Sequence, residues 1–138
     1  MTRWELFAHD ADIGVRGFGP TREVAFEQGA IALMHAIGAG ADVTPKQMVS
    51  VACTAPDCEV LFVDWLNALI FEMATRSMLF SRFRVGIADG ALRAEAWGEP
   101  IDLARHEIAV EAKGATFTAL KVTQGPDGTW VAQCVVDV

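Results

Sequence analysis

Several short segments alternate apolar and polar residues, which is the pattern of a strand with one buried face. Residues 4–7, 13–18 and 49–53 have this pattern in the first half of the chain. In the second half, two such runs flank Asp89-Gly90, a dipeptide that accepts the positive φ of a tight hairpin turn. A last run covers residues 130–138. Together with weaker runs, these segments predict about seven strands.

Two longer segments have the periodicity of a helix. The first begins at Thr21, whose side chain can cap a helix, and stops before Gly38. The second follows Pro56-Asp57 and runs to Thr75, and residues 60–71 within it are apolar almost all round. A helix of this kind is buried at the centre of a domain or presents part of its face to a partner.

The weaker runs lie between the hairpin and the last strand. Ile108 and Val110 alternate with polar neighbours, and the apolar residues of 117–122 suggest another strand. Two helices and strands that are mostly in hairpins predict an α+β fold, a two-layer α/β sandwich with a mixed, mostly antiparallel sheet. Because we find no repeat or linker, residues 1–138 are expected to form a single domain.

Composition and charge restrict the function. Apolar residues make up 52% of the chain and charged residues 21%, which is typical of a globular protein. The net charge of -7, with 11 basic residues scattered singly, argues against strong direct binding to nucleic acid. The longest apolar stretch, residues 59–74, is interrupted by Asp64, Asn67 and Glu72 and is too polar and too short for a membrane span.

The cysteines indicate a cellular compartment. Cys53, Cys58 and Cys134 are odd in number, and no apolar leader precedes the first strand, so a disulfide framework is not expected. This usage predicts a protein of the reducing cytoplasm.

The densest group of cation-binding or proton-transferring side chains is near the N-terminus, at His9, Asp10 and Asp12. In extended chain, residues two apart point to the same side, so the two aspartates could converge on one hard cation. Such ions take more oxygen ligands than two carboxylates supply, and a charged turn is the simpler alternative. Asp137 and the main-chain carboxyl of Val138 would add ligands if the last strand paired beside Asp12, which spacing alone does not establish.

Other candidate residues have weaker support. His106 has the chemistry of a general base and lies near Asp102, but a surface turn is the simpler interpretation. His35, in the first helix, is assigned a packing or surface role. Cys53 and Cys58 lie five residues apart in apolar surroundings, which does not suggest a zinc site.

Several motifs, taken together, resemble the archease family. The first, His9-Asp10-Ala11-Asp12-Ile13-Gly14, is similar to the His-Thr-Ala-Asp-Ile-Gly signature of that family. The others follow in order over essentially the whole chain: Asp64–Leu69, Phe80–Phe83, Gly98–Asp102, His106, Glu111–Phe117 and Val136–Val138.

The resemblance implies an accessory protein and not an enzyme. Archeases assist the RtcB-type GTP-dependent RNA ligase, which joins 2′,3′-cyclic-phosphate or 3′-phosphate ends to 5′-hydroxyl ends in tRNA splicing and RNA repair. They promote guanylylation of the ligase's active-site histidine and so permit multiple turnovers. The resemblance also implies a divalent cation (calcium, or magnesium or manganese) bound by Asp12, Asp137 and Val138.

Two departures from the family pattern accompany the resemblance. Asp10 stands where the signature usually has threonine, which adds a carboxylate beside the cation site. Thr118 stands where the family frequently has a histidine.

Two other functions remain open from the sequence. One is a small metal-dependent phosphoester hydrolase that uses the same carboxylates with His9 as base, and the other is a general chaperone or binding module that uses the apolar helix of residues 60–71. The sharpest expectation of the ligase-activator hypothesis is geometric: the Asp12 and Asp137 carboxylates should be close enough to share one cation.

Overall fold

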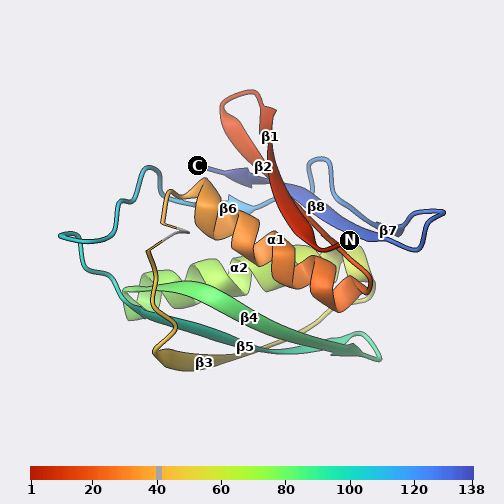
Figure 1. The fold of residues 1–138 in the computed structure, drawn as a ribbon. Coiled ribbons are helices and arrows are strands. Elements are labelled where there is room, and N and C mark those ends of the chain that lie inside the picture. Colours follow the sequence, from red (N-terminus) through yellow and green to blue (C-terminus); the bar gives the residue numbers. More distant parts are fainter. Residues whose placement is uncertain (40–41) are drawn as a thin grey trace.

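The computed structural model describes residues 1–39 and 42–138. Its elements, in chain order, are β1 (Arg3–His9), β2 (Asp12–Gly19), α1 (Arg22–Ala36), β3 (Gln47–Thr54), α2 (Cys58–Arg76), β4 (Met78–Ala88), β5 (Ala91–Pro100), β6 (Gly114–Ala115), β7 (Lys121–Gln124) and β8 (Trp130–Asp137) (Figure 1).

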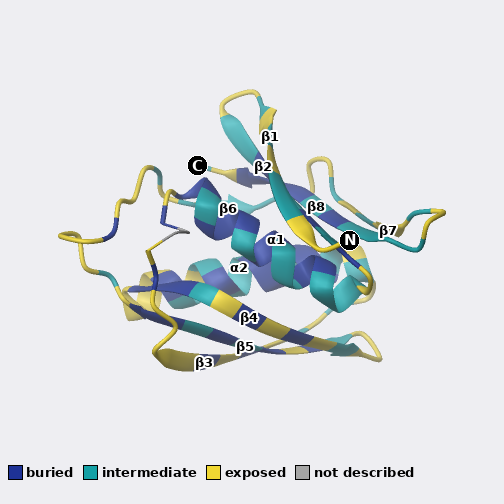
Figure 2. Ribbon diagram, in the orientation of Figure 1, coloured by how far each residue is buried: buried dark blue, intermediate teal, exposed yellow. Residues whose placement is uncertain are grey.

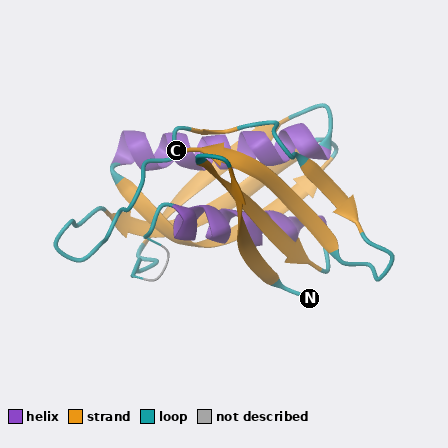
Figure 3. Cartoon of the chain, turned by 90° about the horizontal axis from the view of Figure 1, so that it is seen from above, coloured by secondary structure: helices purple, strands orange, loops and turns teal. Residues whose placement is uncertain are grey.

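The strands form two antiparallel sheets. One has the order β1-β2-β8-β6, with β7 also paired to β8, and the other has the order β3-β5-β4. The two helices lie between the sheets (Figures 1 and 3). The α+β class and the two main helices are therefore confirmed, whereas the expected single sheet in two layers is replaced by two sheets with a helical layer between them.

Both helices are buried on more than one face, which explains the second sheet. Eight residues of α1 and seven of α2 are buried, among them Phe26 and Leu33 in α1 and Phe62 and Trp65 in α2. A helix that is apolar on two sides needs a covering on both. α1 packs against β2 and β4, and α2 packs against β3 and β6, so each helix contacts both sheets. Figure 2 shows buried residues along both helices and on the strands that pack against them.

Local signals placed the element ends correctly. The Thr21 hydroxyl accepts a hydrogen bond from the Val24 N–H at 3.2 Å, and the Asp57 carboxylate accepts one from the Val60 N–H at 2.9 Å, so both predicted helix caps are confirmed. The hairpin turn is also confirmed, because Asp89-Gly90 has φ of 53° and 73° between β4 and β5.

The region after β5 differs from the prediction. Residues 101–113 form no strand, although Ile108 and Val110 alternate with polar neighbours. Together with Ile70 and Met73 of α2, these two residues line an apolar cavity of about 170 Å³. The alternation thus reflects packing against the end of a helix and not pairing in a sheet.

Two further results concern the cysteines and the helices. All three cysteines are free thiols, and burial raises the pKa of Cys134 to about 12. Of the helices in residues 1–39 and 42–138, none has the length and apolar composition needed to cross a membrane.

Candidate functional site

The acidic motif near the N-terminus forms the turn of the β1–β2 hairpin. His9 pairs with Asp12 across the hairpin, and Asp10 and Ala11 make the two-residue connection. Asp10 has a φ of 52° and a side chain that is 94% exposed. Asp10 therefore lies in a turn and not in the extended chain that its convergence with Asp12 on one cation assumed. Aspartate tolerates a positive φ, which accounts for its presence there.

The end of β8 lies beside Asp12. β2 and β8 pair with Ile13 opposite Val136, so their next positions are Asp12 and Asp137 (Figure 1). Beyond the strand, the Val138 N–H donates a hydrogen bond to Asp12 Oδ1 at 3.3 Å. The fold thus joins the beginning and the end of this chain at the three residues that the family resemblance assigned to one cation.

The opposite edge of β8 is held by β6. Gly114 pairs with Asp137, and the Lys113 N–H donates to the Asp137 carbonyl at 2.8 Å. Asn67 of α2 then bonds to the far edge of β6, where its Oδ1 accepts from the Ala115 N–H at 2.8 Å and its Nδ2 donates to the Ala115 carbonyl at 3.3 Å. The side chain of Asn67 therefore takes the place of a neighbouring strand and positions the backbone that carries Asp137.

Sequence reasoning did not assign this role to Asn67. The signal was an amide in a stretch of helix that is otherwise almost entirely apolar. A half-buried amide needs hydrogen-bond partners, and a short strand with a free edge supplies both a donor and an acceptor.

The candidate ligand atoms of Asp12, Asp137 and Val138 are all oxygens. Asp12 and Val138 are half-buried and Asp137 is exposed. Among the described residues, there is no group of three or more His, Cys, Asp or Glu side chains that could hold a metal ion. A cation here would therefore depend on two carboxylates and the main-chain oxygens of Val138. This donor set suits a hard ion such as Ca²⁺, Mg²⁺ or Mn²⁺, and sharing of one ion by the two carboxylates stays a prediction.

Comparison with known protein families decides where the chain belongs. The model of the Archease protein family (MTH1598/TM1083) matches residues 4–138. The chain belongs to the archease family.

Individual archeases agree over the full length. The protein archease of Pyrococcus furiosus is 37% identical over 142 residues, and that of Sulfurisphaera tokodaii is 34% identical over 140 residues, with all of each chain covered in both cases. The solution structure of Methanobacterium thermoautotrophicum protein 1598 has a TM-score of 0.82 and 32% identity, with 98% of each chain covered. An archease from Thermotoga maritima, described as a possible chaperone, has a TM-score of 0.64 and 18% identity, with 97% of this chain and 96% of that one covered; it shows the shared fold.

Another archease motif, Gly98–Asp102, contains a buried carboxylate. Glu99 is 2% exposed, and it accepts a hydrogen bond from the Thr44 N–H at 2.6 Å. It also forms ion pairs with Arg105 and, at 3.9 Å, with Lys46. The Thr44 N–H and then the Arg105 guanidinium lower the pKa of Glu99 to about 2. The carboxylate thereby connects the segment before β3, which contains Thr44 and Lys46, to the segment after β5, which contains Arg105.

His106 is part of the same cluster and is buried, so the surface-turn interpretation of this residue is wrong. Its Nδ1 accepts a hydrogen bond from the Asp102 N–H at 2.9 Å, which leaves the proton of the neutral ring on Nε2. Nε2 lies 3.1 Å from Glu99 and donates to it. Because both ring nitrogens are engaged inside the fold, His106 is a structural residue and not a general base.

The other two histidines lie elsewhere. His35 stacks on Trp4, with ring centroids 4.2 Å apart and ring planes at 17°, so its packing role is confirmed. Burial lowers the pKa of His35, which favours the neutral, stacked ring. His9 lies at the hairpin turn, with Nδ1 3.9 Å from the Asp10 carboxylate, and both side chains are open to solvent.

We expect Glu99→Gln to remove a pH-dependent part of the stability. The folded-state pKa of about 2 is below the ordinary value of 4.5, so ionised Glu99 stabilises the fold above pH 4.5 and loses this effect as the pH falls toward 2. Urea denaturation of the wild type should therefore show a steeper decline in stability over this range than the variant, which should be less stable at neutral pH. Glu111→Gln, at an exposed glutamate, is the control and should follow the wild type. Equal slopes for wild type and Glu99→Gln would contradict the assignment.

Proposed function

We propose that this archease is an accessory protein of an RtcB-type GTP-dependent RNA ligase in the cytoplasm, and that Asp12, Asp137 and Val138 hold a divalent cation used in that role. The observation that supports the site best is the hydrogen bond from the Val138 N–H to Asp12 Oδ1, between residues 126 apart in the sequence. Family membership supports the ligase as partner, because activation of this ligase is what the archease resemblance implies.

The ligand set supports a cation site that is completed from outside. Hard divalent ions take about six to eight oxygen ligands, whereas Asp12, Asp137 and Val138 provide only three carboxyl groups, or three ligands if each binds through one oxygen. Water or groups of the partner would fill the remaining positions. When bound, the cation would supply positive charge near the nucleotide of the ligase, where phosphoryl transfer depends mainly on positioning and charge neutralisation.

The chain's own residues have two tasks in this proposal. The exposed carboxylate of Asp137 and the overall charge of -7 make this end complementary to the basic surface of an RNA-binding ligase, which favours rapid and oriented docking. The bonds of Asn67 to Ala115, and of β6 to β8, keep Asp137 in place before docking. Catalysis itself then stays with the ligase.

We expect Asp12→Ala and Asp137→Ala to abolish the stimulation of ligase turnover while the protein remains folded. The measurement is multiple-turnover RNA joining by the ligase of the same organism at limiting GTP, with circular dichroism to check folding. Each variant should also bind Ca²⁺ or Mn²⁺ about tenfold or more weakly in calorimetry, because a direct ligand contributes at least as much as the groups around it.

Asp10→Asn is the matched control for these variants. It removes an acidic charge two residues from Asp12 and keeps a residue type that tolerates the positive φ of the turn, so it should retain both stimulation and cation affinity. If folded Asp12→Ala and Asp137→Ala still drive multiple turnovers, the cation mechanism is wrong. If the wild type fails to stimulate the ligase, the partner is wrong.

A general chaperone is the second candidate, because the Thermotoga maritima archease is described as a possible chaperone. Phe71 and Phe117 are 62% and 65% exposed and offer apolar contacts to a client. This alternative predicts that the protein suppresses aggregation of unrelated clients, and that Asp12→Ala leaves this effect unchanged. Stimulation confined to the ligase would favour the first proposal.

A further inference from the structure

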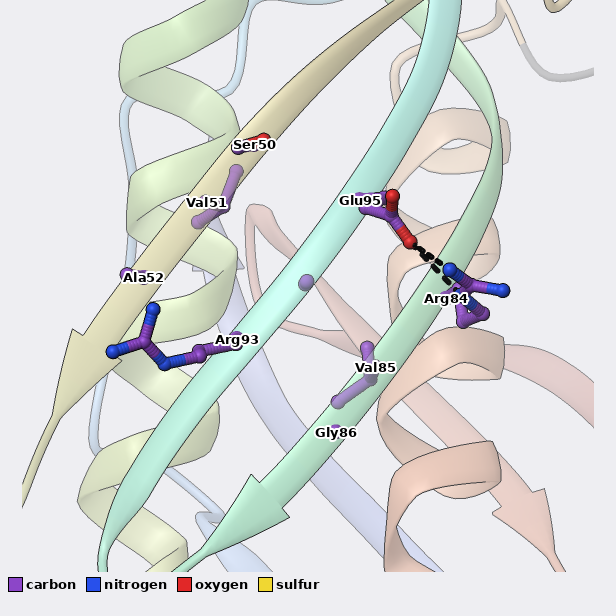
Figure 4. A pocket seen from close by; sticks show the side chains of 9 residues that line it. Ser50, Val51, Ala52, Arg84, Val85, Gly86, Arg93 and Glu95 are labelled. Carbon is purple, nitrogen blue, oxygen red and sulfur yellow. Dashed lines mark hydrogen bonds and ion pairs between the residues drawn. The ribbon is translucent and has the colours of Figure 1, made fainter.

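The outer face of the three-stranded sheet β3-β5-β4 carries three exposed arginines: Arg82 and Arg84 on β4, and Arg93 on β5. In the close-up of Figure 4 the strands lie in front of the helices, and in the described part of the chain no other element crosses this view of the face. The arginines therefore lie on an open surface of a protein whose net charge is -7.

The strand register shows how the arginines are arranged. Arg82 is opposite Trp97, and its guanidinium lies 5.0 Å from the centroid of that ring. Arg84 is opposite Glu95 and donates a hydrogen bond to its carboxylate at 2.8 Å. Arg93 has no carboxylate within ion-pair distance among the residues that the structure describes. The positive charge on this face is thus only partly balanced.

A hollow of about 510 Å³ separates Arg84 from Arg93. It exists because small residues, Ala52 on β3 and Gly86 on β4, lie on either side of Arg93 in the register. In Figure 4 the Arg93 side chain extends toward Ala52, while Arg84 lies beside Glu95 at the other side of the hollow.

Packing does not require a glycine at Gly86. A Cβ atom added there would meet only the Arg93 carbonyl, at 3.6 Å, which is an ordinary van der Waals contact, and Gly86 has no positive φ. The fold therefore does not require a glycine at this position, and the absence of a side chain leaves the hollow open.

We propose that this face binds a short segment of single-stranded nucleic acid, with phosphates at the three arginines and a base beside Trp97. Guanidinium groups match the geometry of phosphate oxygens, and an aromatic ring next to a basic groove is the usual platform for single strands. An acidic peptide fits less well, because peptides join a sheet at its edge through main-chain hydrogen bonds, and the hollow lies across strands that are already paired.

The face is separate from the proposed cation site. The three-stranded sheet lies on the far side of the helical layer from the end of β8 (Figure 1). Binding on this face requires neither a cation nor the ligase. A failure of this proposal would therefore leave the proposed function intact, and a failure of the proposed function would leave this proposal intact. The net charge of -7 opposes nucleic acid elsewhere on the surface, which makes the binding weak and sensitive to salt.

The experiment is fluorescence anisotropy with a labelled single-stranded RNA of about 12 nucleotides, a length within the range of single binding modules. The purified full chain should bind it saturably at low salt. Because each phosphate contact on a single strand contributes about -0.7 to the slope of log K against log salt, three arginines predict a slope of about -2. The Arg84→Ala/Arg93→Ala double variant should bind about tenfold or more weakly, with a slope near -0.7.

Arg3→Ala is the matched control. Arg3 is an exposed arginine on the other sheet that also pairs with a glutamate, Glu5, and lies over an aromatic ring, Phe18, so its loss changes the net charge by as much as the loss of either Arg84 or Arg93 alone. It should leave the affinity within about twofold of wild type.

Two further measurements test the proposal. Gly86→Glu, which puts a carboxylate into the hollow, should weaken binding as much as the double variant. Single-stranded DNA should bind with the same affinity as RNA if phosphate contacts dominate the binding. A lower affinity for DNA would indicate an additional contact to the 2′-hydroxyl of RNA. The proposal is overturned if the wild type does not bind RNA, if Arg3→Ala weakens binding as much as the double variant, or if poly-glutamate binds as well as RNA.

Discussion

Replacing Gly98 with alanine should destabilise the fold by more than about 3 kcal/mol, at the upper end of the cost of overpacking a core. A Cβ atom at this position would lie 1.8 Å from the carbonyl oxygen of Leu79 and 2.8 Å from Phe80 Cα. These are backbone atoms of the neighbouring strand β4, so no side-chain rotation relieves the clash. The contact falls at the register shift between Phe80 and Arg82, where β4 bends close to β5. Urea denaturation followed by circular dichroism measures the loss.

Gly86→Ala is the matched control for Gly98→Ala. Both glycines lie in paired strands of the same sheet, but the space at Gly86 accepts a Cβ without movement. We expect this variant to be neutral, or more stable by up to about 1 kcal/mol, because alanine restricts the unfolded chain. If the two variants lose stability equally, the cost is a general effect of glycine in strands and not the close approach of β5 to Leu79.

The contrast between these glycines shows where sequence analysis stops. Gly98 is recognisable in the sequence as part of an archease motif, yet the reason for glycine is a contact with a strand almost twenty positions away. By comparison, Thr21, Asp57 and Asp89-Gly90 act on backbone within a few residues, and the elements they bound were predicted correctly. Local chemistry is readable from sequence, whereas close packing between strands depends on the assembled fold.

The same distinction applies to the candidate site. Asp12, Asp137 and Val138 were brought together by the family resemblance, since spacing alone could not establish that β2 and β8 pair. The hydrogen bonds of Asn67 were not predicted, because they are made to a two-residue strand, β6, that no sequence pattern indicates. The convergence of Asp10 with Asp12 assumed extended chain, and a strand pattern does not reveal that Asp10 turns with a positive φ.

Trp65→Ala is the second large effect we expect, a loss of about 3 to 5 kcal/mol, as for other large aromatic side chains removed from a core. Trp65 is fully buried, donates a hydrogen bond from its indole Nε1 to the Phe26 carbonyl at 3.0 Å, and packs edge-on against Phe83 at 6.0 Å. It therefore connects α2 to both α1 and β4. Trp97→Ala, on the half-exposed outer face, removes the same side chain and should cost only about 1 kcal/mol, since little apolar surface leaves a packed interior.

Trp65→Phe separates packing from the hydrogen bond, because it keeps an aromatic ring and removes the N–H, so its cost should be intermediate. Trp65 is two residues from Asn67, and a helix that settles into the cavity left by Trp65→Ala moves Asn67 away from β6. Since the Ala115 N–H donates to Asn67 Oδ1, its hydrogen exchange should accelerate in Trp65→Ala and stay slow in Trp97→Ala. If Asp12 and Asp137 hold the proposed cation, its affinity should fall as well. An Ala115 amide that stays protected in Trp65→Ala would show that β6 holds its place without support from α2.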